Sequence, residues 1–285
     1  MSSAIGVANE RLEVVVGETR KLPAFLRRDF LVAWSYRMSF VSDLVALVAQ
    51  ALLFYFIGLL VDSSKLPRFG GTEVTYLEFA AIGIAVGLFI HFALERVAGA
   101  VRGEQLMGTL ESVLVTPTAR ATVQLGSVVF DLVYIPVRTA VFLAAIALAF
   151  GLHLEPSGIL PATALLLAFI PFIWGVGVAS AGAILTFRGG SGAVSMGTMA
   201  LALVSGLYFP LELLPRWLAD VARHNPVALV GDGMREALLG GAGWTDVAPS
   251  LLTIAPMSAC SLILGMAIFR LAVRRERRLG TLGLY

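Results

Sequence analysis

The sequence predicts an all-α, polytopic membrane protein with about six transmembrane helices. Three observations lead to this fold class. Of the 285 residues, 58% are hydrophobic and only 14% are charged, whereas a soluble domain carries about 25% charged residues. Long apolar runs recur along the chain, and a spanning helix needs about 20 such residues. Between these runs lie short segments with polar and apolar sides, which are typical of helices at a membrane surface.

The first predicted element is a helix in the plane of the membrane surface, over residues 22–40. Aromatic residues recur there at helical spacing, and basic residues gather on another side. Such a helix buries its apolar face at the acyl boundary and keeps its charges in water. The alternative is that the segment simply begins the first transmembrane helix. The residues that define the interfacial helix are Phe25, Arg27, Arg28, Phe30 and Trp34.

A series of apolar runs follows, and each run predicts a transmembrane helix. Prolines at three places fall inside these runs, where neighbouring helices can compensate for the lost hydrogen bonds. Arg138 lies within the third run, and a charge inside a membrane suggests a functional role by default. Arg138 either lines a conduit for an anionic group or extends to the inner interface. The runs are Leu44–Val61, Phe79–Leu94, Leu132–Leu152, Ile159–Phe187, Gly189–Leu211 and Val247–Phe269, and the prolines are Pro136, Pro171 and Pro256.

The distribution of Lys and Arg residues predicts the orientation. With the N-terminus inside, the inner segments hold roughly three times as many Lys and Arg residues as the outer loops, which matches the positive-inside rule. We therefore expect a single multi-pass domain over residues 1–285, with both termini in the cytoplasm. The outer set is Lys65, Arg68, Arg216, Arg223 and Arg235.

The stretch GEQLMGTLESVLVTP, residues 103–117, lies between the second and third runs. Leucines recur every four residues on one side, and glutamates lie largely on the other, so the stretch predicts an amphipathic helix at the cytoplasmic surface. Pro117 ends this helix because the residue before a proline avoids helical geometry. From spacing alone, the helix either stabilises the ends of its neighbours or receives a partner protein.

Two motifs resemble the hallmarks of type-2 ATP-binding-cassette (ABC) export permeases, a family of multidrug, lipid and polysaccharide transporters. The first motif reads E-x-x-x-G-T-L-E-x-x-L-x-T-P and occupies the stretch just described. The second reads F-P-x-x-x-L-P after the fifth run, followed by N-P and R-x-x-L-x-G. The first comprises Glu104, Gly108, Thr109, Leu110, Glu111, Leu114, Thr116 and Pro117, with Leu106 on its apolar side. The second includes Phe209, Pro210, Leu214, Pro215, Asn225, Pro226 and Arg235.

This resemblance implies a role for each motif. Residues 103–117 would form the coupling helix, which docks on a cytoplasmic ABC ATPase, and residues 210–240 would form re-entrant helices at an outer gate. The implied working unit contains two ATPases and a second permease, identical or different, in a prokaryotic plasma membrane. The chain has no G-x-x-x-x-G-K-[ST] stretch, so ATP and Mg would be bound by the partner. We expect no cofactor, catalytic residue, metal site or nucleic-acid partner in this chain, and we expect contact with membrane lipid.

The sequence therefore predicts the permease subunit of an exporter that moves an amphipathic substrate, a drug-like molecule or a lipid, out of the cytoplasm or the inner leaflet. Lipid-linked polysaccharide is the alternative substrate. A channel that works without an ATPase is the alternative of another class, but it needs a polar-lined pore, and the predicted spans carry few polar residues. An intramembrane enzyme would need convergent catalytic groups, and none stands out.

Overall fold

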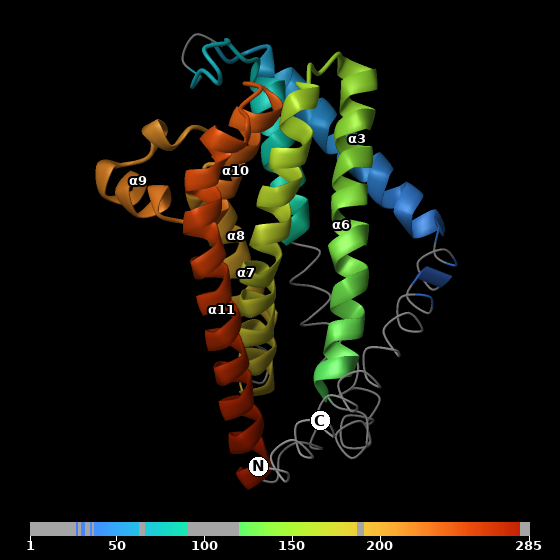
Figure 1. Ribbon diagram of the computed structural model, residues 1–285, viewed down its shortest axis with the longest axis vertical. Coiled ribbons are helices and arrows are strands. Elements are labelled where there is room, and N and C mark those ends of the chain that lie inside the picture. Colours follow the sequence, from blue (N-terminus) through green and yellow to red (C-terminus); the bar gives the residue numbers. More distant parts are fainter. Residues whose placement is uncertain are drawn as a thin grey trace, which may run out of the picture.

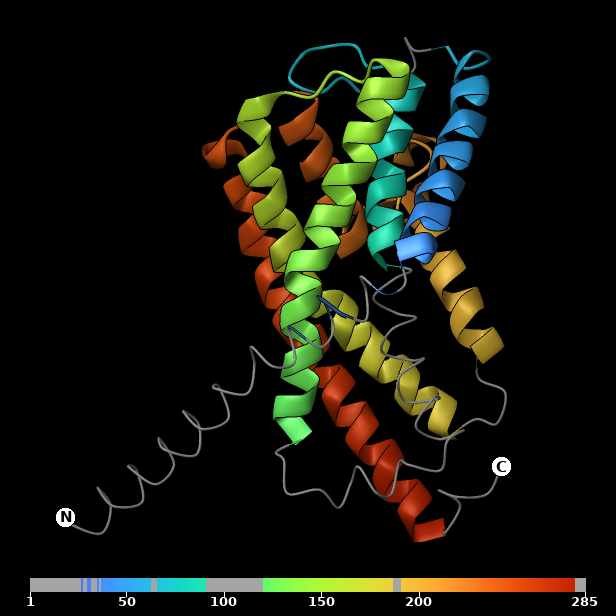
Figure 2. The ribbon, with the colours of Figure 1, turned by 90° about the vertical axis from the view of Figure 1, so that its right-hand side faces the viewer.

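A computed structural model describes residues 37–62, 66–90, 120–186 and 191–279, together with residues 27, 30, 31 and 35. The secondary structure of this part of the chain is helical and includes no β-strand. The long helices run beside one another along one axis of the molecule, while the short helices α9 and α10 lie toward one end (Figures 1 and 2). The all-α prediction is confirmed.

The helices follow the apolar runs, but several of them begin or end at other residues than predicted. Helix α6 begins well before Leu132, the predicted start of the third run. Helix α8 ends at Val204, before the predicted end of the fifth run, because Gly206 turns the chain with a φ of 66°. The elements are α3 (Arg37–Gly58), the helix Tyr76–Ile90, α6 (Arg120–Phe150), η2 (Pro156–Gly158), α7 (Ile159–Thr186), α8 (Ser191–Val204), η3 (Leu211–Leu213), α9 (Arg216–Arg223), α10 (Pro226–Leu238) and α11 (Trp244–Leu279).

Two of the described helical stretches are long and apolar enough to cross a membrane. These are Pro156–Thr186 and Trp244–Glu276, with mean hydropathies of 2.1 and 2.0. Shorter apolar stretches overlap the first three predicted spans, at Val48–Gly58, Tyr76–Ile90 and Pro136–Phe150. The structure thus supports a membrane protein, and the total number of spans stays a prediction.

Helices α7 and α11 pack closely against each other (Figure 1). A Cβ atom on Gly175 would lie 2.3 Å from the carbonyl carbon and oxygen of Ser261, so this contact requires glycine. The Ser261 hydroxyl donates a hydrogen bond of 3.0 Å to the carbonyl oxygen of Phe172. Small residues that allow backbones to approach, together with hydrogen bonds between helices, hold helices together in lipid.

The main core joins the helix Tyr76–Ile90, α7 and α10. Phe89 and Phe169 are fully buried, and their ring centroids lie 5.6 Å apart. Val230 and Met234 of α10 belong to the same buried cluster. Helix α10 is therefore packed into the body of the bundle, although it is too short to span a membrane.

The region predicted at residues 210–240 contains η3, α9 and α10. Asn225 lies between α9 and α10. Its side-chain oxygen accepts a 3.0 Å hydrogen bond from the Val227 amide and so caps the start of α10. Pro226 occupies the first position of α10, where its missing amide hydrogen costs nothing. The helices are present as expected, and their re-entry into the membrane stays a prediction.

Candidate functional site

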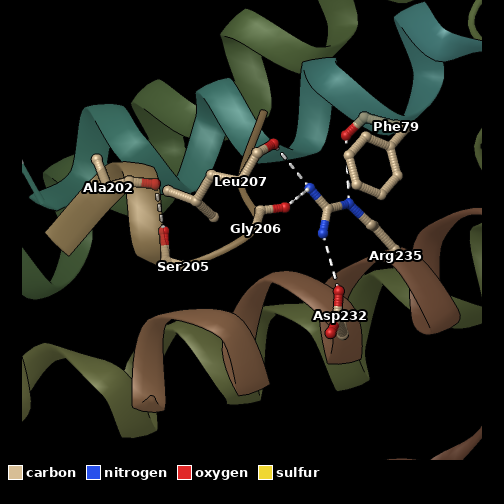
Figure 3. A network of polar contacts seen from close by, with 7 residues as sticks. All are labelled: Phe79, Ala202, Ser205, Gly206, Leu207, Asp232 and Arg235. Atoms are coloured by element: carbon tan, nitrogen blue, oxygen red, sulfur yellow. Dashed lines mark hydrogen bonds and ion pairs between the residues drawn. The ribbon is translucent and has the colours of Figure 1, made fainter. Parts of the chain in front are cut away.

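A buried arginine, Arg235, lies at the centre of the most connected polar network among the described residues (Figure 3). Its side chain is 1% exposed. The guanidinium donates from Nε to the Phe79 carbonyl at 3.2 Å, and from Nη2 to the carbonyls of Gly206 at 3.2 Å and Leu207 at 2.8 Å. Nη1 donates to Asp232 Oδ1 at 2.9 Å. One side chain therefore binds α10, the helix Tyr76–Ile90 and the turn after α8.

The backbone around Leu207 explains why this arrangement forms. The turn after α8 leaves carbonyl groups without helical partners, and a buried carbonyl needs a donor. Gly83 lets this turn approach the neighbouring helix, because a Cβ atom there would lie 1.7 Å from the Leu207 carbonyl oxygen. The planar fork of Arg235 then supplies several donors from one position.

The Phe79 ring adds a further contact to the guanidinium. The Cζ atom of Arg235 lies 3.7 Å from the centroid of this ring, which is a cation–π geometry. Asp232, one turn earlier on α10, is the acidic partner, with a side chain that is 53% exposed. Burial raises the pKa of the Asp232 carboxyl, although the Arg235 guanidinium acts in the opposite direction. The acidic end of the pair is open to solvent, whereas the guanidinium makes its three other hydrogen bonds to backbone carbonyls inside the protein.

The far end of α10 is bound to the loops on either side of it. The Glu236 carboxylate accepts a hydrogen bond of 3.2 Å from the Gly70 amide. The Glu155 amide donates at 2.8 Å to the Leu238 carbonyl. Gly240 lies against Gly70, because a Cβ atom on Gly240 would lie 2.6 Å from the Gly70 nitrogen. Helix α10 is thus fixed along its length by contacts from elements distant in sequence.

Of the predicted outer-gate residues, only one belongs to this network. Arg235 is its centre. Pro210 and Pro226 are buried at the starts of η3 and α10, while Pro215 is exposed at the start of α9. Phe209 and Leu214 are half-buried, and Leu214 packs against the small cluster of Leu211, Ala222 and Ala228.

The other predicted sites are only partly covered by the structure. Arg138 is half-buried in α6, and its role in a conduit stays a prediction. Arg27 and Phe30 have helical backbone and exposed side chains, whereas Phe25, Arg28 and Trp34 lie outside the described residues. The predicted coupling segment, residues 103–117, also lies outside them. Within the described ranges no three His, Cys, Asp or Glu side chains gather as a metal site would require.

Sequence reasoning did not identify the partners of Arg235. The Asp232–Arg235 spacing of three residues on a predicted helix is a signal for an ion pair. The carbonyls of Phe79, Gly206 and Leu207 carry no such signal, because any residue type supplies a backbone carbonyl.

The all-α fold, the apolar helices and the network that joins the short helix to its neighbours define a helical membrane protein. Residues 20–239 match the ABC-2 type transporter family. The chain belongs to this family and is a membrane component of an ABC transporter.

A curated relative is the linearmycin resistance permease protein LnrN of Bacillus subtilis (strain 168). The two sequences are 22% identical over 203 residues, which cover 71% of this chain and 49% of the relative. The chain thus spans about half the length of the curated relative it matches. The relative is named as a resistance permease, and the similarity supports a permease without identifying the substrate.

Proposed function

We propose that this chain is the transmembrane permease subunit of an ATP-driven exporter, which moves an amphipathic molecule out of the cytoplasm or the inner leaflet. The observation that carries the proposal is the family match over residues 20–239, which includes both motif regions. The relative is named for resistance to linearmycin, which supports removal of a harmful compound over uptake. A drug-like molecule or a lipid is the substrate class, and lipid-linked polysaccharide is the alternative.

Energy for transport enters at the cytoplasmic side. We propose that residues 103–117 dock on a separate ABC ATPase, which binds ATP and Mg. A helix seated in a partner transmits movement only when it is stiff and firmly held. An exposed ion pair contributes about 0–1 kcal/mol, so the leucines of the segment would supply most of the affinity and the glutamates would set the register.

The arginine network supports a gate at the opposite end of the protein. Arg235 binds the helix Tyr76–Ile90, the turn after α8 and its own helix α10 through one rigid guanidinium. Parts held in this way move together, because separating any one of them leaves buried carbonyls without a donor. We propose that opening moves these three parts as a unit.

The substrate path would run between two copies of the permease. Helix α8 carries large apolar side chains that are exposed in the single chain, namely Met196, Met199 and Leu203. Large exposed apolar surfaces mark binding or membrane-contacting sites. A path lined by such apolar side chains suits an amphipathic molecule better than an ion. We propose that two permeases and two ATPases form the working unit.

Reconstitution with a candidate ATPase tests this function. The chain would be purified with a P-loop ATPase, placed in lipid vesicles, and ATP hydrolysis measured with drug-like amphiphiles, lipids and lipid-linked glycans. We expect stimulation by amphiphiles or lipids and none when the P-loop Lys of the ATPase is replaced. Stimulation by glycans alone would support the alternative substrate. Solute flux through the chain without any ATPase would instead show a channel and contradict the proposal.

A further inference from the structure

A groove of about 720 Å³ runs along the outside of the α7–α11 pair. Side chains of both helices line it, and several of those from α7 are small. Pro226 at the start of α10 also lines the groove, but no residue of the Arg235 network does. The residues that characterise it are Gly175, Ala179 and Ala183 from α7, and Cys260, Leu264 and Ile268 from α11.

The length of the groove matches one leaflet of a bilayer. On α11 the groove extends from Met257 to Ile268, which is about 16 Å at 1.5 Å per residue. Half of the hydrocarbon core of a membrane is about 15 Å thick. The first charged residue after the groove is Arg270, so Ile268 lies near the edge of the hydrocarbon region and Met257 near its middle.

Two arginines continue the same side of α11 beyond the groove. A residue advances 100° around a helix, so Arg275 lies within about 20° of Ile268 around the axis. Arg278 lies within about 40° of Leu264 by the same geometry. Both side chains are exposed on this helix, and neither forms an ion pair with another of the described residues. Arg275 follows Ile268 at an axial distance of about 10 Å. Its long, flexible side chain can extend back along the helix toward the groove.

We propose that this groove binds an anionic phospholipid of the surrounding bilayer. One acyl chain lies against Leu264 and Ile268, and the phosphate and anionic headgroup contact Arg275 and Arg278. The small residues of α7 provide room for the chain, and basic residues beside a membrane-spanning helix attract anionic lipids. The proposal depends on the chain spanning a membrane and not on the transported substrate.

Cys260 provides the probe, because it is the single cysteine of the chain, is exposed and lines the groove. The full chain is labelled there with a small bimane fluorophore. It is reconstituted in phosphatidylcholine vesicles that contain a fixed fraction of either brominated phosphatidylglycerol or brominated phosphatidylcholine. Bromine quenches the label only at close range. We expect phosphatidylglycerol to bind with a roughly 25-fold preference, since each of the two arginines contributes about fivefold at an anionic surface.

Matched charge variants identify the headgroup contact. The double variant Arg275→Gln and Arg278→Gln removes the preference for phosphatidylglycerol. Arg270→Gln removes a charge from the opposite side of the same helix and keeps the preference. Equal quenching by both lipids in the unmodified chain would mean ordinary bilayer contact and overturn the proposal. Absence of quenching by either lipid would mean that another protein surface, such as a second copy, covers the groove, and this outcome would overturn it as well.

Discussion

The guanidinium of Arg235 donates to the carbonyl oxygen of Leu207 at 2.8 Å, and so joins α10 to the turn that follows α8. This contact lies inside the protein, where water cannot replace either partner. The backbone turn is thereby tied to a packed helix. The relationship makes the turn, α10 and the helix Tyr76–Ile90 one mechanical unit, and several outcomes depend on it.

Replacing Arg235 with alanine should destabilise the protein by about 3 kcal/mol, because three buried carbonyls lose their donor and Asp232 loses its partner. The stability of the Arg235→Lys variant should lie between that of Arg235→Ala and that of the unmodified protein, since an ammonium cannot reach all the carbonyls from one plane. Thermal unfolding in detergent micelles measures the effect. Arg216→Ala, an exposed arginine of α9, should change stability by less than about 0.5 kcal/mol. Equal losses in both alanine variants would contradict a special role for the network.

Gly83→Ala should cost about 1–3 kcal/mol, the range for overpacking a well-packed contact. The added methyl group would occupy the space of the Leu207 carbonyl oxygen, 1.7 Å from its centre. The Arg235 contacts should loosen as a consequence, and export should fall together with thermal stability. Gly192→Ala is the control, because nothing lies within 4 Å of an added Cβ atom there. An unchanged melting temperature in Gly83→Ala would contradict this prediction, because it would show that the turn can shift without a loss of stability.

The sequence predicted the helices well because lipid imposes a simple rule on them. Apolar runs of sufficient length must be helical in a membrane, and the runs Ile159–Phe187 and Val247–Phe269 correspond to α7 and α11. The ends of the helices were predicted less well. Helix α8 ends early, because Gly206 turns the chain before the fifth apolar run is complete. Composition alone does not reveal which glycine in such a run adopts a positive φ.

Arg235 shows why the site was harder to predict. A count of basic residues treats every outer arginine as a charge in water, and Arg235 was counted in this way. In the structure its charge is satisfied by backbone carbonyls from two distant segments. These partners depend on tertiary packing, and their own side chains, Phe79 and Leu207, carry no polar signal. The family motif marked the position without indicating its contacts.

Asp232→Asn should reduce stability by only about 1 kcal/mol, less than Arg235→Ala. The asparagine oxygen can still accept from Nη1, and burial already raises the pKa of the carboxyl despite the nearby guanidinium. Asp220→Asn is the matched control on α9, where the pair with Arg223 is exposed and 3.8 Å long. Asp220→Asn should reduce stability by no more than about half as much as Asp232→Asn does. A loss in Asp232→Asn as large as in Arg235→Ala would show that the ion pair, and not the carbonyl contacts, holds the network.

Leu110→Asp should disrupt the proposed contact with the ATPase. Burial of a leucine contributes about 2 kcal/mol, so its loss alone weakens binding about 30-fold, and a buried carboxylate adds to the effect. Glu111→Arg should weaken the complex less, because it changes the register without removing apolar contact. Co-purification of a tagged ATPase from membranes measures both, and Ser112→Ala, on the polar side of the same segment, serves as the control. Full recovery of the ATPase with Leu110→Asp, at an unchanged amount of permease in the membrane, would exclude residues 103–117 as the docking element.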